Sequence, residues 1–130
     1  MTEVDKLVVE KVIPYREGIL EIMKQKHPLI IQMGEKVLGV MESYFGMQVL
    51  ENGVLAGQYT FQMKGVHVVN TEVGKLEPKF KLPFADAAVK PYMIVEKSVL
   101  ERFLKDEKLK SDLFKAMPAY LPDITIKFLK

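Results

Sequence analysis

Apolar residues recur with helical spacing near the start of this chain and alternate with polar residues in its middle. Leu7–Ile13 is rich in branched apolar residues and predicts a short edge strand, which Pro14 ends. A short apolar stripe over residues 19–23 predicts a helix that ends before Pro28, because the residue before a proline disfavours the helical region. Leu29–Phe45 predicts the strongest helix of the chain, with an apolar face that would pack on a sheet. That face comprises Ile30, Met33, Val37, Leu38, Met41, Tyr44 and Phe45.

The middle of the chain carries the patterns of β-strands. Met47–Glu51 and Val54–Ala56 flank Asn52-Gly53, the pair that best suits a type I′ hairpin because both turn positions need a positive φ. Gln58–Lys64 alternates strictly, with apolar side chains at its odd positions and polar ones at its even positions, so it predicts a half-buried strand. Val66–Val73 predicts a further strand.

The last third of the chain predicts two strands that enclose two helices. Residues 79–82 first predict a short edge strand in a proline-rich stretch. Tyr92–Glu96 predicts the next strand and Asp123–Leu129 the last one. Between them, Ser98–Lys105 and Ser111–Met117 predict two amphipathic helices, and the serine that begins each is predicted to be its N-cap.

The order of these elements decides the fold class. Helices, then an antiparallel meander, then strand–helix–helix–strand are typical of an α+β domain. We expect a mostly antiparallel sheet of about five strands with the helices packed on one face. The 130 residues suit a single domain over residues 1–130, and no linker, internal repeat or low-complexity stretch divides them.

Charge argues against nucleic acid as a partner. The 19 basic residues face 17 acidic ones, a net charge of +2, and only Arg16 and Arg102 are arginines. Because the arginine fork is preferred for bidentate recognition of guanine and phosphate, we expect no nucleic-acid partner. A weak attraction of the lysines to anionic membrane surfaces stays open.

Three further absences in the sequence bear on where the protein works. No apolar run approaches the ~20 residues that a membrane span needs. The first five residues lack the basic and then apolar plan of a signal peptide, and the chain has no cysteine. We therefore expect a cytoplasmic protein with no transmembrane segment.

The sequence offers no constellation for catalysis. His27 and His67 lie 40 residues apart, which is no metal-ligand spacing, and each stands without a nearby nucleophile. For His67 a hydrogen-bonded or exposed place in a strand is a simpler interpretation than a general base. Neither GxGxxG nor GxxxxGK[ST] occurs. We expect no enzymatic activity, no metal and no cofactor.

Large apolar side chains are more numerous than two short helices on a sheet require. The chain also has eight methionines, which re-pack easily around flexible apolar guests but suit an irregular core equally well. We predict an apolar cavity between the sheet and the two C-terminal helices. Its predicted lining consists of Tyr59, Phe61, Met63, Leu100, Phe103, Leu104, Phe114 and Met117.

Residues 93–117, MIVEKSVLERFLKDEKLKSDLFKAM, resemble the signature segment of the sterol carrier protein type 2 family. In that family a strand, a helix, an elbow, a second helix and a last strand follow one another. The corresponding residues here are Ile94–Glu96, Val99-Leu100 with Phe103-Leu104, Lys108–Lys110, Leu113-Phe114 and Ile124–Phe128. The resemblance covers about residues 29–130 and implies a lipid-binding fold.

The sequence departs from this family in ways that keep a second function open. The elbow has no glycine, and residues 117–123 replace a glycine-rich turn with an insert that holds two prolines. Because this sequence ends with the last predicted strand, we expect it to lack the C-terminal helix that covers the tunnel in many relatives. The first hypothesis is a non-catalytic carrier of apolar ligands such as lipids or fatty acyl chains. The alternative is a protein interaction module or a homo-oligomer that buries its apolar faces against a partner.

Overall fold

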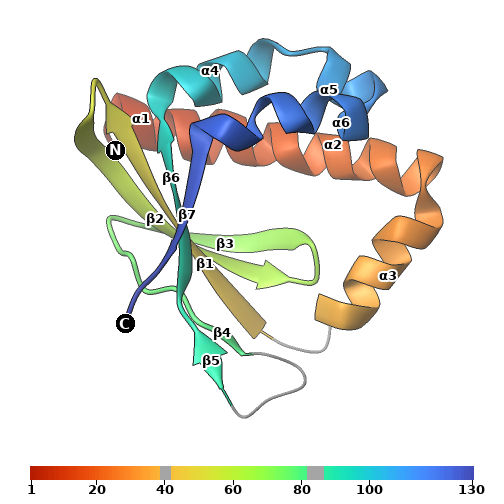
Figure 1. Cartoon of the computed structure of the whole chain (residues 1–130), viewed down its shortest axis with the longest axis horizontal. Coiled ribbons are helices and arrows are strands. Elements are labelled where there is room, and N and C mark those ends of the chain that lie inside the picture. Colours follow the sequence, from red (N-terminus) through yellow and green to blue (C-terminus); the bar gives the residue numbers. More distant parts are fainter. Residues whose placement is uncertain (39–41, 82–86) are drawn as a thin grey trace.

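A five-stranded sheet carries helices on one of its faces (Figure 1). The computed structural model describes residues 1–38, 42–81 and 87–130. Within these residues the strand order is β3-β2-β1-β6-β7, and only the central β1–β6 pair is parallel. The strands are β1 (Glu42–Glu51), β2 (Val54–Lys64), β3 (His67–Val73), β6 (Pro91–Glu96) and β7 (Ile124–Phe128). This arrangement confirms the α+β class and the mostly antiparallel sheet.

A single long helix opens the chain and corrects the first predicted element. α1 (Glu3–Lys6), a π-helical stretch (Leu7–Val12) and α2 (Ile13–Lys26) follow one another without a break and form what we call the N-terminal helix. The edge strand predicted for Leu7–Ile13 is therefore wrong. Branched side chains favour strands locally, but valines at positions 4, 8 and 12 recur every fourth residue and bury together against the sheet. Tertiary packing thus overrides the local preference.

The second helix, α3 (Pro28–Leu38), is shorter than predicted and faces the other way. Tyr44 and Phe45, expected at its end, lie in β1. Among the side chains of α3 that the structure describes, Ile31 is buried, whereas Ile30 and Met33 of the predicted packing face are exposed. Other predicted members of that face lie outside the residues whose side chains the structure describes: Val37, Leu38 and Met41. The helix that packs along the sheet is the N-terminal helix instead.

The predicted hairpin and the alternation of β2 are confirmed. Asn52 and Gly53 have φ values of 53° and 79° and join β1 to β2. Tyr59, Phe61 and Met63 are all buried and face the helices. The predicted strand Val66–Val73 is present as β3. Within the predicted strand 79–82, Phe80–Lys81 forms the short strand β4, which pairs with β5 (Ala88–Val89), and Leu82 lies outside the described residues.

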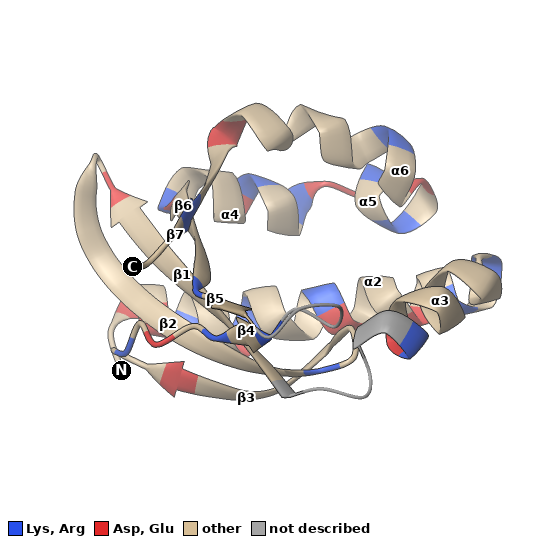
Figure 2. Cartoon of the chain, turned by 60° about the horizontal axis from the view of Figure 1, so that its bottom comes forward, with Lys and Arg blue, Asp and Glu red and all other residues tan. Residues whose placement is uncertain are grey.

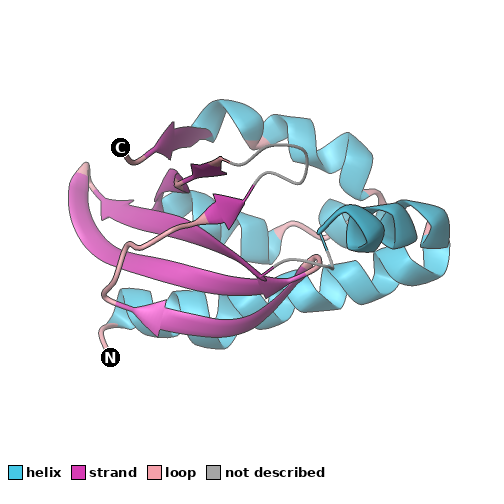
Figure 3. Cartoon of the chain, turned by 90° about the horizontal axis from the view of Figure 1, so that it is seen from below, coloured by secondary structure: helices cyan, strands magenta, loops and turns pink. Residues whose placement is uncertain are grey.

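The segment after β3 covers part of the other face of the sheet. The Thr60 hydroxyl donates a hydrogen bond to the carbonyl oxygen of Lys75 (2.8 Å) and accepts one from the Glu77 amide (2.9 Å). Gly46 leaves room for Leu76, which a side chain at that position would strike. Figure 3 shows this loop crossing in front of the strands, with the helices behind them.

The C-terminal helices are more broken than predicted. α4 (Lys97–Lys105) follows β6 directly, so Glu96 is its N-cap and the capping box predicted at Ser98 is not formed. The predicted helix Ser111–Met117 is divided into α5 (Lys108–Ser111) and α6 (Leu113–Ala116), followed by two 3₁₀ turns (Met117–Ala119 and Leu121–Asp123). Asp112 lies at the break and caps α6, because its carboxylate accepts a hydrogen bond from the Lys115 amide (3.3 Å). Ser111 is therefore not the cap.

Two apolar clusters hold these elements together. The larger one joins the N-terminal helix and α4 to the sheet, and comprises Val4, Val8, Val12, Met47, Val49, Tyr59, Phe61, Met63, Val95 and Leu100. The smaller one joins α2 and α3 to the C-terminal helices, and comprises Ile19, Met23, Ile31, Leu109, Ala116 and Tyr120. The N-terminal helix belongs to both clusters, so the placement of α4 beside it depends on both.

Candidate ligand-binding groove

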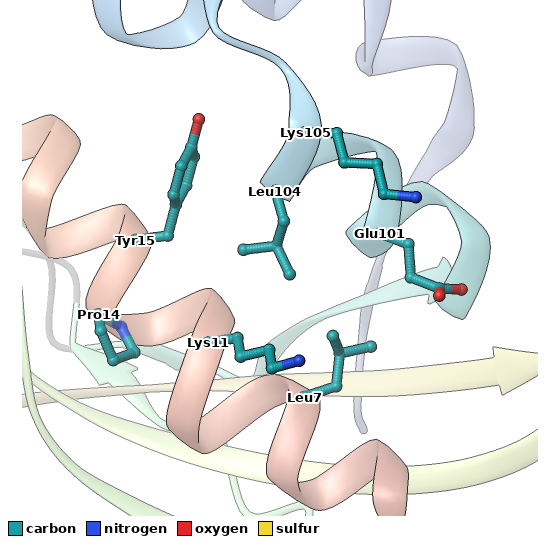
Figure 4. Close-up of a pocket in the computed structure, with 7 residues that line it drawn as sticks. All are labelled: Leu7, Lys11, Pro14, Tyr15, Glu101, Leu104 and Lys105. Carbon is teal, nitrogen blue, oxygen red and sulfur yellow. The ribbon is translucent and has the colours of Figure 1, made fainter.

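A groove of about 580 Å³ lies between the N-terminal helix and α4 and opens to solvent. Figure 4 shows Leu104 of α4 pointing toward the N-terminal helix, and Leu7 and Tyr15 of that helix pointing toward α4. Its lining consists of Leu7, Lys11, Pro14, Tyr15, Glu101, Leu104 and Lys105. The volume falls within the range of about 300–1,000 Å³ that is usual for small-molecule sites.

Helical spacing places these side chains in two facing rows. Leu7, Lys11 and Tyr15 stand four residues apart, so they lie on one side of the N-terminal helix. Glu101 and Lys105 have the same spacing in α4, with Leu104 between them. Each helix thus contributes apolar surface to the floor of the groove and charge to its rim.

Tyr15 forms a fixed wall at one end of the groove. Its hydroxyl donates a hydrogen bond to the carbonyl oxygen of Asp106 (2.9 Å), and its ring meets Phe103 edge-on with centroids 5.3 Å apart. The Lys110 ammonium lies 5.0 Å from the centre of the same ring. Burial raises the pKa of Tyr15, and the negative charges of Asp106 and Glu107 raise it further. Tyr15 therefore stays neutral across the physiological range.

The charges on the rim are free to meet a ligand. In the described parts of the chain, Lys11, Lys105 and Glu101 each lack an ion pair and a side-chain hydrogen bond. Glu101 and Lys105 have the spacing of a helical ion pair but do not form one. Two unpaired ammonium groups beside an apolar floor can hold a carboxylate or a phosphate through charge-assisted hydrogen bonds.

The sequence-predicted site residues are spread over several environments. Leu104 is the one that lines the groove. Tyr59, Phe61, Met63 and Leu100 lie in the larger cluster, where the N-terminal helix covers them.

The remaining three predicted residues lie around the smaller cluster. Phe103 packs between Tyr15 and Tyr120, with centroid distances of 5.3 Å and 6.0 Å. Met117 is half-buried against the smaller cluster. Phe114 is exposed and lines a second pocket.

Sequence reasoning missed the half of the groove that comes from the N-terminal helix. Leu7 and Lys11 lay in a predicted strand, and Pro14 was assigned to its end. The four-residue spacing of Leu7, Lys11 and Tyr15, which runs parallel to that of the buried valines, is the signal that could have found them.

The second pocket, of about 250 Å³, lies where the end of α2 meets α5 and α6. The Lys26 ammonium donates a hydrogen bond to the carbonyl oxygen of Ser111 (3.2 Å) across it. The His27 ring meets Phe114 edge-on with centroids 5.6 Å apart. Leu109, Leu113 and Phe114 give this pocket an apolar side.

His67 connects three elements through carboxylates. Its Nδ1 lies 3.0 Å from Oε2 of Glu17 in α2, and its Nε2 lies 3.6 Å from Oε1 of Glu35 in α3. The Glu17 carboxylate also accepts a hydrogen bond from the Val68 amide (2.8 Å). This network fixes α2 and α3 to the start of β3. The described residues contain no group of three or more histidine and carboxylate side chains that could hold a metal ion.

Comparisons with known proteins assign this chain to no family. Neither the models of known protein families nor the curated proteins match this chain. Of the helices that the structure describes, none is long and apolar enough to cross a membrane.

Proposed function

We propose that this protein is a non-catalytic binding module or carrier for single-chain anionic lipids, such as fatty acids, and that the groove holds them. One observation supports this most strongly: an apolar floor lies beside ammonium groups that have no partner among the residues that the structure describes. The residues concerned are Leu7, Pro14 and Leu104 on the floor and Lys11 and Lys105 on the rim. The acyl chain lies along the floor, and the carboxylate meets the lysines.

Burial of the acyl chain contributes more to the binding free energy than the attraction between the head group and the lysines. Each methylene that leaves water contributes about 0.8 kcal/mol, so the acyl chain supplies most of the affinity. The lysines add a smaller term and orient the ligand. Glu101 on the same rim disfavours a second negative charge, so a ligand with one anionic head group fits best. Because the groove is open, part of the chain stays in water, which favours exchange over tight retention.

The resemblance of residues 29–130 to the sterol carrier protein type 2 family supports the same proposal, since that family binds lipids. We propose further that the protein belongs to that family and works in the cytoplasm. The groove differs from the cavity predicted from sequence, because its ligand lies on the N-terminal helix and α4 rather than on the face of the sheet.

Filling the groove should abolish binding. Leu104→Trp places an indole between the two helices, and we expect at least a tenfold loss of affinity for a fluorescent fatty acid in a titration. Leu104 is half-buried against the larger cluster but also lines the open groove, so we expect a loss of stability smaller than the cost of about 1–3 kcal/mol that overpacking has in a packed core. Leu55→Trp, at an exposed place in the β1–β2 hairpin, is the matched control and should bind as the wild type does. The absence of saturable binding to the wild type would refute the carrier proposal.

Removing either rim charge should weaken only anionic ligands. Lys11→Gln and Lys105→Gln should each lower the affinity for a fatty acid about five- to tenfold, which corresponds to about 1–1.4 kcal/mol. Binding of the fatty alcohol of the same length should be unaffected, because it carries no charge. Lys64→Gln, on the opposite side of the sheet, is the control. Equal losses for the acid and the alcohol would show that the lysines do not meet the head group.

A second candidate function, a homo-oligomeric interaction module, is favoured by the edge strand β7. Its outward edge has no partner strand among the described residues, and Ile126 and Phe128 on it are exposed. Such an edge can pair with the same strand of a second copy. Light scattering after size-exclusion chromatography tests this: a dimer that Ile126→Lys converts into a monomer would support the interaction module, and a wild-type monomer at high concentration would reject it.

A further inference from the structure

The outward side of α3 is apolar and uncovered. Leu29, Ile30 and Met33 are 72%, 48% and 67% exposed, whereas Ile31 is 6% exposed. Two more observations show which side of the helix is docked: a side chain added at Gly34 would meet Val66, and the Glu35 carboxylate lies 3.6 Å from Nε2 of His67. Leu29 and Met33 are four residues apart and therefore share the opposite side. These three apolar side chains of α3 therefore face water in the folded chain.

Lysines precede and follow these apolar residues in the sequence. Lys24 and Lys36 are exposed, and the Lys26 ammonium donates a hydrogen bond to the carbonyl oxygen of Ser111. Glu35 is directed to His67 on the other side of the helix. Residues 24–36 hold three lysines and one glutamate, a net charge of +2 that equals the charge of the whole chain. Figure 2 shows Lys and Arg at the end of α2 and on α3, and further ones on α4, α5 and α6 with acidic residues among them. The segment that carries the exposed apolar residues of α3 therefore has a net positive charge.

We propose that α3 docks on the surface of an anionic membrane. Leu29, Ile30 and Met33 enter the boundary between head groups and acyl chains, while the flanking lysines meet the lipid phosphates and carboxylates. A short amphipathic helix with lysines beside its apolar face is suited to lie in this interface, and its lysines can extend to the head groups. Lysine gives a diffuse attraction to anionic lipids that needs no fixed geometry.

The charge of this surface decides between a membrane and other occupants. A second copy of the chain would bring the same lysines face to face, which repels. An anionic lipid surface carries the opposite charge, and its acyl-chain region can bury the exposed apolar side chains. The proposal stands independently of the groove, because docking requires no ligand in it.

Sedimentation with vesicles tests the charge requirement. The full chain should bind vesicles of phosphatidylcholine with about 30 mol% phosphatidylserine, and bind pure phosphatidylcholine far more weakly. Lys24→Gln and Lys36→Gln should each reduce the partition coefficient about fivefold, the factor that corresponds to about 1 kcal/mol per lysine. Lys127→Gln, on β7, is the matched control and should change nothing. Raising the salt from about 0.1 M to about 1 M should release the protein, because the Debye length falls from about 10 Å to about 3 Å.

A tryptophan reporter tests the docking surface itself. The chain has no tryptophan, so Leu29→Trp gives a single probe on α3 and Leu55→Trp a matched probe on the hairpin. Both positions are exposed, so neither variant disturbs the core. With anionic vesicles, the emission of the probe at position 29 should shift to the blue and become less accessible to iodide. The probe at position 55 should show no blue shift and should be quenched by iodide as readily as without vesicles. Equal responses, no vesicle binding by the wild type, or a dimer in solution that Leu29→Gln breaks would each overturn the proposal.

Discussion

Replacement of Phe61 by alanine should lower the free energy of unfolding by about 3–5 kcal/mol. Phe61 is 7% exposed and stacks on Tyr59 with ring centroids 6.3 Å apart, under the N-terminal helix. Removing its ring leaves a cavity between the N-terminal helix and the sheet, and the surrounding side chains can fill that cavity only in part. Urea unfolding monitored by circular dichroism measures the change.

Phe128→Ala is the matched control for this experiment. It removes the same ring from the exposed edge strand β7, where the loss should stay below about 1 kcal/mol. An unchanged midpoint for Phe61→Ala, or equal losses in both variants, would contradict the packing of the N-terminal helix on this face.

The buried hydrogen bond between Tyr59 and Asp5 should contribute the second large effect. The Tyr59 hydroxyl donates to Oδ1 of Asp5 over 2.7 Å, and Tyr59 is fully buried. Tyr59→Phe removes the donor and leaves a buried carboxylate short of a partner, so we expect a loss of about 1.5–3 kcal/mol at pH 7. Urea unfolding of Tyr59→Phe, Asp5→Asn and the double variant gives the coupling energy. Additive losses would show that the two groups do not interact.

The same pair predicts how stability depends on pH. The hydrogen bond from Tyr59 lowers the pKa of Asp5 below its ordinary value of 3.8, and the bonds with Thr2 lower it further. A carboxylate with a lowered pKa contributes stability that is complete above the pKa of the unfolded state and is lost as the pH falls through that of the folded state. The wild type should therefore lose stability more steeply below about pH 4 than Tyr59→Phe does. Parallel acid profiles would contradict this assignment.

The strands were predictable because their signals are local. The alternation of Gln58–Lys64 and the Asn52-Gly53 turn each specify a face or a bend within a few residues. Neither depends on which distant segment covers the sheet. The register of β1 with β2 and the buried face that includes Phe61 follow from these two signals.

The helices were harder to predict because their limits depend on packing. Branched residues in Leu7–Ile13 favour a strand locally, and only contact with the sheet makes a helix the better choice. In Leu29–Phe45 the apolar positions continue from helix into strand, because Tyr44 and Phe45 suit either period.

Only the side of the groove that α4 forms could be predicted, because the other side depends on packing between distant segments. Leu104 lies in a helix whose amphipathic pattern is clear, so it was among the predicted ligand contacts. Lys11 and Tyr15 come from a segment about 90 residues earlier, and only the folded arrangement brings them opposite α4. A single sequence carries no signal for that pairing.

The location of a bound fatty acid tests the central claim most directly. A fatty acid with a nitroxide label on its chain broadens the amide NMR signals of nearby residues in the full chain, and a reduced label provides the reference. We expect broadening at Lys11, Tyr15 and Leu104 on the two walls of the groove, and intact signals at Gln62 and Glu72 on the sheet. Broadening centred on the sheet residues, or none at saturating ligand, would contradict the assignment of the groove as the lipid site.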